Sequence, residues 1–520
     1  MKIIKHSSSI LSPILSKLIN KGMEDGVFPD ELKIGRITPI YKKENPELLE
    51  NYRPVSTLPI FGKIFEKVVY KRLYNYFSSK GLMYGNQYGF RKDHSTSHAL
   101  NYSIDLVKSA IDKGNHVIGI FIDLSKAFDT IDHKIMTSKL QHYGIRGQPL
   151  KLLTSYLSNR TQYVSTLNEK SDLADVIYGV PQGSVLGPLL FLIYVNDLPN
   201  CHSMTQFILF ADDTNIFVIG KDRNECTDKA NRLLKDVYHY MKANKLHINA
   251  KKSCFMHFQP KNSTSNELSS PIFINKTEID EVSCTKFLGV TIDNKLCWEP
   301  HINILIKKLR SAIGSICRVS KFLPKNLQKT LYQTLFESHL SYGITVWGNA
   351  AKKFTSKLFI IQKHCIRVLL GDKESYLAKF ETCMRVRQFG KQKLGPEFYI
   401  RESSKPLFNK NHILSIHNLY TSRTLLEIFK VLKSRNPYPI YQNLHLSTRK
   451  STLLVLPKLT TTHSYQASIL WNKLRNQLSP ADKEDFSSPL GKIKNIIRSL
   501  LAAKQNLGDS SRWDDLNFEF

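Results

Sequence analysis

Two short apolar runs separated by a polar pentapeptide are the most informative feature of the hydrophobic pattern. Residues 207–210 read FILF and residues 216–218 read IFV, and both are rich in the Phe and Ile that favour buried strands. The intervening residues 211–215, ADDTN, have the composition of a tight turn. The pattern therefore predicts a β-hairpin that presents Asp212 and Asp213 together at its tip.

This hairpin has two interpretations. Adjacent carboxylates repel one another, so the pair is costly unless something neutralises it. A divalent cation does this well, because hard ions such as Mg²⁺ take carboxylate oxygens and keep positions open for water and phosphate. A solvated turn that happens to hold two acids explains the hairpin equally well when the hairpin is considered alone.

A second apolar run changes this balance. Residues 117–122 read VIGIFI, which is another buried-strand pattern, and Asp123 follows it directly. A carboxylate at the end of one strand and a pair on a neighbouring hairpin can face each other across a sheet. That geometry can hold two metal ions ~4 Å apart for in-line phosphoryl transfer.

Other segments show helical rather than strand periodicity. Residues 7–28 carry Ile and Leu on one helical face, and apolar positions at helical spacing return after residue 300. The extended segment 36–41 contains Pro39, which cannot donate to a ladder and predicts an edge strand at best. Further helices are expected near 302–316, 328–340 and 354–370, the last of them ending at Gly371. The chain is therefore expected to mix helices and sheet.

The length of the chain indicates how many domains it forms, and its net charge indicates what kind of molecule it binds. A chain of 520 residues is long enough for two or more domains with an ample core. Its formal net charge of +30 favours a polyanionic partner, most simply nucleic acid, with a membrane surface as the weaker alternative. No apolar run approaches ~20 residues, so no membrane-spanning helix is expected.

The cysteines and the first residues indicate the compartment. The eight cysteines are scattered without close pairs or zinc-site spacing, as is typical of buried thiols in a reducing compartment. The residues after Met1 contain no apolar core long enough for a signal peptide. An intracellular protein of the cytoplasm and nucleus is therefore expected.

Three sequence motifs in order resemble one enzyme family. Residues 120–129 read IFIDLSKAFD, residues 179–188 read GVPQGSVLGP and residues 210–213 read FADD. They are similar to motifs A, B and C of reverse transcriptases, specifically of non-LTR retrotransposons of the LINE-like, Jockey type. The Phe-Ala before the acid pair is typical of that branch. The resemblance covers residues 7–370 well and 411–500 loosely.

The resemblance implies an α+β fold of the right-hand polymerase type with a mainly helical C-terminal region. In that arrangement an antiparallel palm sheet carries the catalytic motifs. The expected domains are fingers at 1–115, palm with primer grip at 116–295, helical thumb at 296–371, a basic linker or insertion at 372–411, and the C-terminal helical region at 412–520. The endonuclease that normally precedes the fingers in this family is not expected in this chain.

The same resemblance assigns the catalytic residues. Asp123 and Asp212, assisted by Asp213, would bind two Mg²⁺ ions, with Mn²⁺ as a possible substitute. Lys252 is the candidate general acid for the pyrophosphate leaving group, because a lysine beside a developing anion can donate a proton. A lysine that is merely solvated is an equally good interpretation of Lys252. Asp129 is expected to be a structural acid.

A further set of residues would contact the nucleotide and the primer. Lys42 and Arg53 would hold the triphosphate, because the planar guanidinium of an arginine can pair with two phosphate oxygens at once. Both residues could instead be ordinary surface cations. Phe128 would exclude a 2′-hydroxyl, or would otherwise be a core aromatic. Arg91 would contact the template or the triphosphate, and Leu124 would offer its backbone carbonyl to a metal ion. Gln182 and Gly183 would lie near the nucleotide. Phe287, Leu288 and Gly289 would form a primer grip, although an ordinary core hairpin would also explain these three residues.

These expectations predict an RNA-directed DNA polymerase of a non-LTR retrotransposon. Its partners would be template RNA, a DNA primer or target DNA, and dNTPs, with no membrane. An inactive relic of a retrotransposon that only binds nucleic acid is the alternative from another class. An RNA-copying RNA polymerase shares the acid pair, but Phe128 argues against it.

Overall fold

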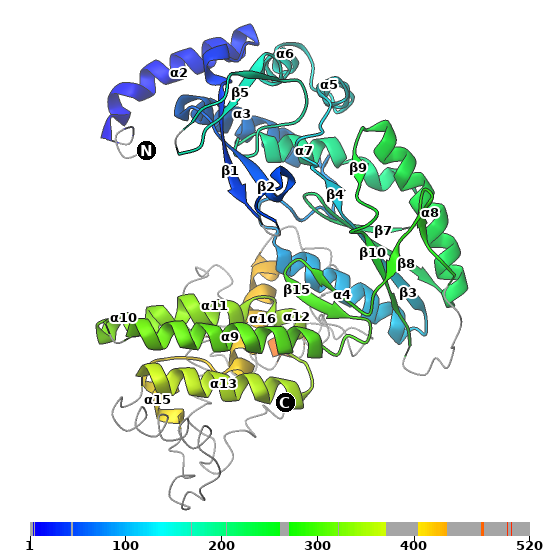
Figure 1. Ribbon diagram of the computed structural model, residues 1–520, viewed down its shortest axis with the longest axis vertical. Coiled ribbons are helices and arrows are strands. Elements are labelled where there is room, and N and C mark those ends of the chain that lie inside the picture. The colour runs from blue at the N-terminus through cyan, green and yellow to red at the C-terminus, as the bar shows by residue number, and fades with distance from the viewer. Residues whose placement is uncertain are drawn as a thin grey trace, which may run out of the picture. The chain divides into compact units, whose positions relative to one another are not determined.

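The computed structural model describes residues 4, 6–42, 45–167, 169–203, 205–260, 270–320, 322–370, 404–433, 468, 470–472, 497 and 501. These residues form helices and sheets (Figure 1), which confirms the expected mixture. The chain divides into two compact units. The first contains residues 1–95, 116–257 and 264–282, and the second contains 96–115, 258–263 and 283–520.

A five-stranded sheet is central to the first unit. Its strand order is β13-β10-β3-β8-β7, and β3 pairs with β8, and β8 with β7, in antiparallel register. Six of the seven residues of β3 are buried, as a strand covered on both faces requires. The strands are β3 (His116–Ile122), β7 (Gln206–Phe210), β8 (Asp213–Gly220), β10 (Cys254–Phe258) and β13 (Asp280–Glu281).

Helices bury the faces of this sheet. Helix α8 (Arg223–Ala243) contacts both β3 and β8 and lies along the sheet in Figure 1. Helix α7 (Gly187–Val195) is apolar all round and almost completely buried, as expected of a helix inside a core. Its neighbour α5 (His133–His142) also contacts α6 (Gly147–Leu157). Side chains from these helices and strands form one continuous core.

A second sheet in the same unit has the strand order β2-β1-β5-β6. Strand β1 (Gly35–Tyr41) lies between β2 (Tyr52–Thr57) and β5 (Arg160–Val164), so the expectation that this segment would form only an edge strand was wrong. Strand β5 pairs only with residues 35–37 of β1. Pro39 lies beyond that pairing, so its missing N–H costs no ladder hydrogen bond on that side. Strand β6 (Ala174–Val176) completes the sheet.

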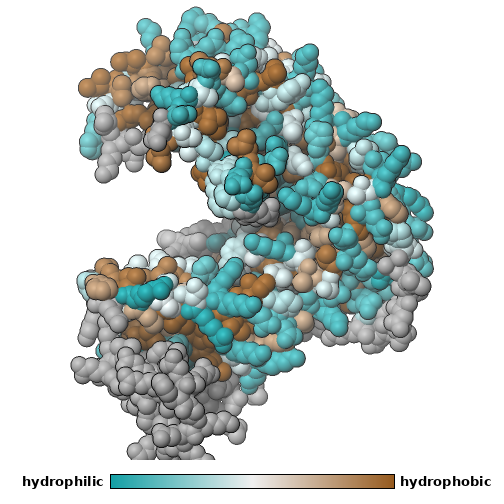
Figure 2. All heavy atoms as spheres, in the orientation of Figure 1, coloured by the Kyte–Doolittle hydropathy of each residue, from teal (hydrophilic) through white to brown (hydrophobic). Residues whose placement is uncertain are grey.

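The N-terminal helix forms where the sequence predicts it, but its apolar face is largely exposed. Helix α2 (Ser8–Asp25) ends at Gly26, which adopts the left-handed conformation of a C-cap. Only Ile19 of its apolar face is buried, and Figure 2 shows apolar side chains gathered over this helix. The exposed members of that face are Ile10, Ile14 and Leu18.

The remaining elements of the first unit are short apart from one helix. Helix α3 (Ile60–Ser79) buries Phe65, Leu73 and Phe77 in the core. The others are η1 (Asp30–Leu32), η2 (Leu49–Asn51), β4 (Leu124–Ser125), η3 (Leu198–Cys201), β9 (His247–Ile248), β11 (Phe273–Ile274) and β12 (Thr277–Glu278).

The second unit is mainly helical. Helix α9 (Glu299–Ser320) packs against α13 (Lys352–Leu370) with Ile302, Leu305 and Leu309 buried. The other elements are α4 (Thr96–Asp112), the hairpin of β14 (Cys284–Phe287) and β15 (Val290–Asp293), α10 (Lys325–Leu331), η4 (Tyr332–Glu337), α11 (Ser338–Ser341), α12 (Ile344–Trp347), α15 (Lys405–Lys410) and α16 (Ile416–Lys433). No helix among the described residues is long and apolar enough to cross a membrane.

Two expected regions lie mostly outside the described residues. Of the predicted linker 372–411, residues 372–403 are not described. Of the predicted C-terminal region 412–520, the described part is α16 with its preceding turn and a few single residues, among them the buried Trp471.

Asp132 ties the loop after motif A to two other elements. Its Oδ1 atom caps α5 by accepting from the backbone N–H groups of Lys134 at 2.8 Å and Ile135 at 3.0 Å, and its Oδ2 accepts from Lys245 Nζ at 2.6 Å. Burial disfavours the charge, but the Lys245 ammonium and the backbone donors together hold the pKa of Asp132 below its ordinary value.

We predict that Asp132→Ala lowers the free energy of unfolding at pH 7 by about 1–2 kcal/mol, the size of a lost N-cap. The unfolded carboxyl titrates near 3.8, so the stabilisation is present above that pH and is lost as the pH falls through the lower folded pKa. Urea denaturation of wild type and variant from pH 7 to pH 3 should therefore show a difference that shrinks with acid. Asp228→Ala on the exposed face of α8 is the control and should change stability little.

Candidate active site

The acid pair lies at the tip of the β7–β8 hairpin. Phe210 pairs with Asp213 across the hairpin, so the turn consists of Ala211 and Asp212 alone. This is shorter than the expected turn over 211–215, because Asn215 already belongs to β8 and its buried amide donates to the carbonyl of Ile208 at 3.2 Å. Ala211 has a positive φ of 57°, as tight two-residue hairpin turns require.

Asp123 is placed next to this tip by the strand register. Ile122 pairs with Thr214, so the next position along each strand brings Asp123 beside Asp213. The backbone of Asp123 is held on both sides: its N–H donates to Ser253 Oγ at 3.2 Å, and its carbonyl accepts from Asn249 N–H at 2.9 Å. The three predicted acids, far apart in sequence, are therefore brought together by one sheet.

The pKa values show that the three carboxylates interact. Although the side chains reach solvent, partial burial and then the charges of Asp212 and Asp123 raise the pKa of Asp213 to about 6. Burial and the charge of Asp123 likewise raise the pKa of Asp212, while Arg53 and Lys42 oppose the shift. Asp212 and Asp213 therefore ionise against both partial burial and the charge of neighbouring carboxylates.

This donor set fits a divalent cation that is completed by other oxygens. No group of three or more His, Cys, Asp or Glu in the described part of the chain is arranged to hold a metal ion by its own atoms. Mg²⁺ is usually bound by one or two carboxylates, with water and substrate phosphates filling the remaining positions. Burial and the charges of neighbouring carboxylates raise the pKa values of Asp212 and Asp213, and a bound cation would neutralise the negative charge of this cluster.

Two of the predicted phosphate-binding cations act on the same acids. Arg53 lies on β2 opposite Ile40 of β1, and Lys42 follows β1, where its N–H donates to the carbonyl of Asn51 at 2.8 Å. Both side chains are exposed, and both charges bear on Asp212. The β1–β2 hairpin thus places two cations where a polyphosphate could bridge them to a metal ion.

The turn that carries Lys252 adjoins Asp123. Lys252 is exposed, and its backbone N–H donates to the carbonyl of Asn249 at 3.1 Å. Because Asn249 and Ser253 both bond the backbone of Asp123, this turn and the acid form one local structure. Leu124 continues it by pairing with Ile248 in the β4–β9 ladder.

Residues 86–89 support the acid pair from beneath, a role that the sequence did not reveal. Gln87 Oε1 accepts from the backbone N–H of Ala211 at 3.1 Å and from that of Gly89 at 2.9 Å. The backbone N–H of Tyr88 donates to the carbonyl of Leu209 at 2.8 Å, and the backbone N–H of Leu209 donates to the carbonyl of Asn86 at 3.0 Å. Gly89 lies so close that a Cβ on it would stand 2.3 Å from the nitrogen of Ala211.

Arg91 is turned toward its own loop. Its Nη1 donates to the carbonyl of Tyr84 at 2.7 Å and to that of Gln87 at 3.1 Å, and burial lowers the pKa of the guanidinium. This geometry gives Arg91 a role in holding the loop that supports the hairpin. Its contact with template or triphosphate stays a prediction.

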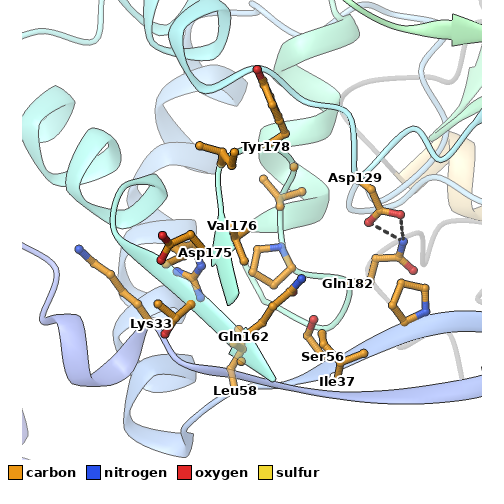
Figure 3. A pocket seen from close by; sticks show the side chains of 18 residues that line it. Lys33, Ile37, Ser56, Leu58, Asp129, Gln162, Asp175, Val176, Tyr178 and Gln182 are labelled. Carbon is orange, nitrogen blue, oxygen red and sulfur yellow. Dashed lines mark hydrogen bonds between the residues drawn. The ribbon is translucent and has the colours of Figure 1, made fainter. Parts of the chain in front are cut away.

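Motif B is locked to the loop after motif A. Gln182 Nε2 donates to both oxygens of Asp129 at 2.9 Å (Figure 3), and the carbonyl of Gln182 accepts from Ser56 N–H at 2.8 Å. Gly183 has φ +137°, and a Cβ there would stand 2.3 Å from the carbonyl oxygen of Ser56. Asp129 is thus a structural acid in this geometry, and Gly183 permits the close approach of the two segments.

Phe128 lies between two other rings. It stacks on Phe191 of α7 with a centroid distance of 4.6 Å and meets Phe90 edge-on at 6.3 Å. The side chain is half-buried, so it combines core packing with an exposed surface that could meet a sugar.

The predicted primer grip forms the turn of the β14–β15 hairpin in the second unit. Phe287 is buried, and the carbonyl of Leu288 accepts from Tyr342 OH at 2.6 Å. Leu288 and Gly289 have positive φ values of 44° and 86°, and the Tyr342 ring leaves little room for a side chain at Gly289.

Comparisons with known proteins identify what this chain resembles. The family model described as reverse transcriptase (RNA-dependent DNA polymerase) matches residues 40–292. A probable RNA-directed DNA polymerase from transposon X-element of Drosophila melanogaster is 28% identical over 66% of this chain and 38% of its own length. The RNA-directed DNA polymerase from mobile element jockey of the same species is 28% identical over 69% of this chain and 40% of its own. The chain thus spans about two fifths of the length of these curated relatives.

Among the solved structures that align with this chain are two telomerases. Apo telomerase from Candida tropicalis aligns with a TM-score of 0.39 and 10% identity, over 74% of this chain and 73% of its own. Telomerase from Candida albicans in complex with a fragment of telomeric RNA aligns with a TM-score of 0.37 and 12% identity, over 70% and 63%.

The contact beneath the hairpin tip is testable. Because a Cβ on Gly89 would overlap the backbone of Ala211, we predict that Gly89→Ala lowers the free energy of unfolding by about 1–3 kcal/mol, as overpacking does. Gly85→Ala in the same loop is the matched control, because its Cβ would meet nothing within 4 Å. Chemical denaturation should separate the two variants, and equal stability would show that the loop does not clamp the tip.

Proposed function

Given that this chain belongs to the reverse transcriptase family, we propose that it copies RNA into DNA as the RNA-directed DNA polymerase of a non-LTR retrotransposon. The observation that carries the proposal is the convergence of Asp123, Asp212 and Asp213 at one end of the five-stranded sheet, with their charges coupled. Its partners would be template RNA, a DNA primer or target DNA, and dNTPs.

The domain assignment belongs to the same proposal. The five-stranded sheet with its helices would be the palm, the β1–β2 hairpin and the residues up to 115 the fingers, and the helices between residues 296 and 371 the thumb. The β14–β15 hairpin would grip the primer. Residues 372–411 would be a basic linker and residues 412–520 a helical region that binds template RNA or target DNA.

The three acids would hold two Mg²⁺ ions, which when bound supply charge neutralisation at the triphosphate and activation of the primer 3′-hydroxyl. Asp123 and Asp212 would be the main ligands, with Asp213 assisting. Their mutual repulsion supports this role, because it favours cation binding over an unneutralised cluster.

The chain's other residues would position the nucleotide. Lys42 and Arg53 would hold the triphosphate beside Asp212, whose charge they already offset. Lys252 would give a proton to the pyrophosphate as it leaves. Leu124 would offer its carbonyl, while Gln182 and Gly183 would lie against the nucleotide and the template base.

The acid cluster gives the central test. We predict that Asp212→Ala lowers primer extension on an RNA template with dNTPs and Mg²⁺ by at least about a hundredfold, because charge stabilisation by metal is worth several kcal/mol. Removing the metal with EDTA should abolish the wild-type reaction. Asp228→Ala on α8 is the matched control and should extend primers normally.

Two results would contradict this proposal. If the Asp212→Ala variant extended primers as fast as wild type, the proposed two-metal mechanism would be refuted. If wild type bound primer–template but showed no metal-dependent synthesis, the chain would instead be a relic that only binds nucleic acid through its net charge of +30.

The half-buried ring of Phe128 gives a second test. If its exposed surface meets the sugar, Phe128→Ala should admit a 2′-hydroxyl and reduce the preference for dNTPs over rNTPs by about ten- to a hundredfold, the discrimination that one steric contact supplies. Single-nucleotide incorporation with matched dNTP and rNTP measures this ratio. An unchanged ratio together with slower dNTP incorporation would mean that Phe128 serves only the packing with Phe191.

A further inference from the structure

The turn of the β14–β15 hairpin has a strained backbone. Phe287 pairs with Val290, so Leu288 and Gly289 alone form the turn. Both have a positive φ, as the two central residues of a type I′ turn do. Asn or Gly usually takes the first of these positions, because the Cβ of other residues disfavours the left-handed conformation. A leucine there needs support from the surrounding structure to persist.

Tyr342, which follows α11, supplies this support. Its hydroxyl donates to the carbonyl of Leu288 at 2.6 Å, and its ring lies against the backbone of Gly289, where a Cβ would stand 3.0 Å from Cε1. The hydroxyl oxygen is also 3.2 Å from Thr96 Oγ1. A phenol has a single hydrogen but can accept as well, so both bonds can form when the Thr96 hydroxyl donates. The phenol is therefore held on two sides.

The backbone of Tyr342 is itself fixed. Its carbonyl accepts from Nε1 of the fully buried Trp347 at 2.9 Å. The next residue, Gly343, lies so close to β15 that a Cβ on it would stand 2.7 Å from Val290 Cγ2. The phenol is thus directed at the turn from a rigid part of the second unit.

The bond from Tyr342 determines which way the central peptide of the turn faces. Type I′ and type II′ turns differ by a flip of the peptide that joins their two central residues. In this turn the Leu288 carbonyl faces Tyr342, and because the peptide is trans, the N–H of Gly289 faces the opposite way. A flip would break the bond with Tyr342.

We propose that Tyr342 is a positioning residue of the primer grip, which keeps this peptide in one orientation so that the turn presents a fixed surface to the end of the primer. This rests on the proposed function, in which the β14–β15 hairpin grips the primer. Tyr342 would act through the backbone of Leu288 and Gly289 and would not touch the reacting atoms. A turn that flips would let the primer end move, which slows bond formation more than it weakens binding.

The test is single-turnover addition of one nucleotide by the full chain to a DNA primer annealed to an RNA template. Tyr342→Phe removes only the hydroxyl and keeps the ring against Gly289. The rate at saturating dNTP should fall about three- to tenfold, the worth of one hydrogen bond. The Kd for primer–template should change by less than about twofold, because phosphate contacts supply most of that affinity.

Tyr332→Phe is the matched control for a purely structural loss. Its hydroxyl accepts from Gln362 Nε2 at 2.9 Å, and both side chains are buried in the same unit. This variant should lower the free energy of unfolding, because it leaves a buried donor without a partner, while the single-turnover rate stays at the wild-type value. Equal slowing in Tyr332→Phe and Tyr342→Phe would overturn the positioning role.

A second background tests whether the hydroxyl acts through the turn. Asn followed by Gly favours a type I′ turn by itself. In a Leu288→Asn background, Tyr342→Phe should therefore slow the reaction by less than about twofold, and comparison within each background removes the effect of Leu288→Asn itself. The same fractional loss in both backgrounds would mean that the hydroxyl does not act by holding the turn.

Hydrogen exchange of the free protein separates this proposal from its premise. Over residues 284–293, which form the hairpin, Tyr342→Phe should exchange about three- to tenfold faster than wild type, and Tyr332→Phe should not. Faster exchange in a chain whose wild type never extends a primer would refute only the proposed function. Extension at equal rates by wild type and Tyr342→Phe, or unchanged exchange in Tyr342→Phe, would refute only the role of Tyr342.

Discussion

Repulsion among three carboxylates is the constraint on which the rest of the site depends. Asp123, Asp212 and Asp213 would separate if their backbones were free, because like charges repel, and burial together with the neighbouring charges raises the pKa values of Asp212 and Asp213. They stay together because the β3–β8 register and the two-residue turn fix the backbone positions of all three residues. The hydrophobic burial of those strands offsets the electrostatic cost locally.

Uncharged residues do much of the positioning of the acid pair and of motif B. Gln87 accepts from the backbone beneath the acid pair, and Gly89 allows the supporting loop to approach within contact of Ala211. On the other side, Gln182 joins Asp129 to Ser56 and so links motif B to the four-stranded sheet. Hydrogen bonds of Gln182 thus connect the loop after motif A to strand β2 of the four-stranded sheet.

Features that depend on a local stretch of sequence were predicted more reliably than contacts between distant segments. The strands that flank the acids were predicted because a buried strand needs a continuous apolar run, which is a local signal. The environment of Arg91 was not predicted, because its partners are loop carbonyls and backbone acceptors leave no trace in sequence. The interior position of β1 was missed because Pro39 looks incompatible with a sheet until the short length of the β5 pairing is known.

By itself the sequence determined the chemistry of this protein: the acids, the cations Lys42 and Arg53, the apolar strands and the order of the three motifs. These follow from residue type and spacing along the chain. Only the tertiary structure decided that Asp123 meets the acid pair, that Gln87 and Gly89 support the tip, and that Tyr342 bonds the Leu288 carbonyl. The physical reason is that strand register, close backbone approach and burial arise between segments distant in sequence, where local patterns carry no information.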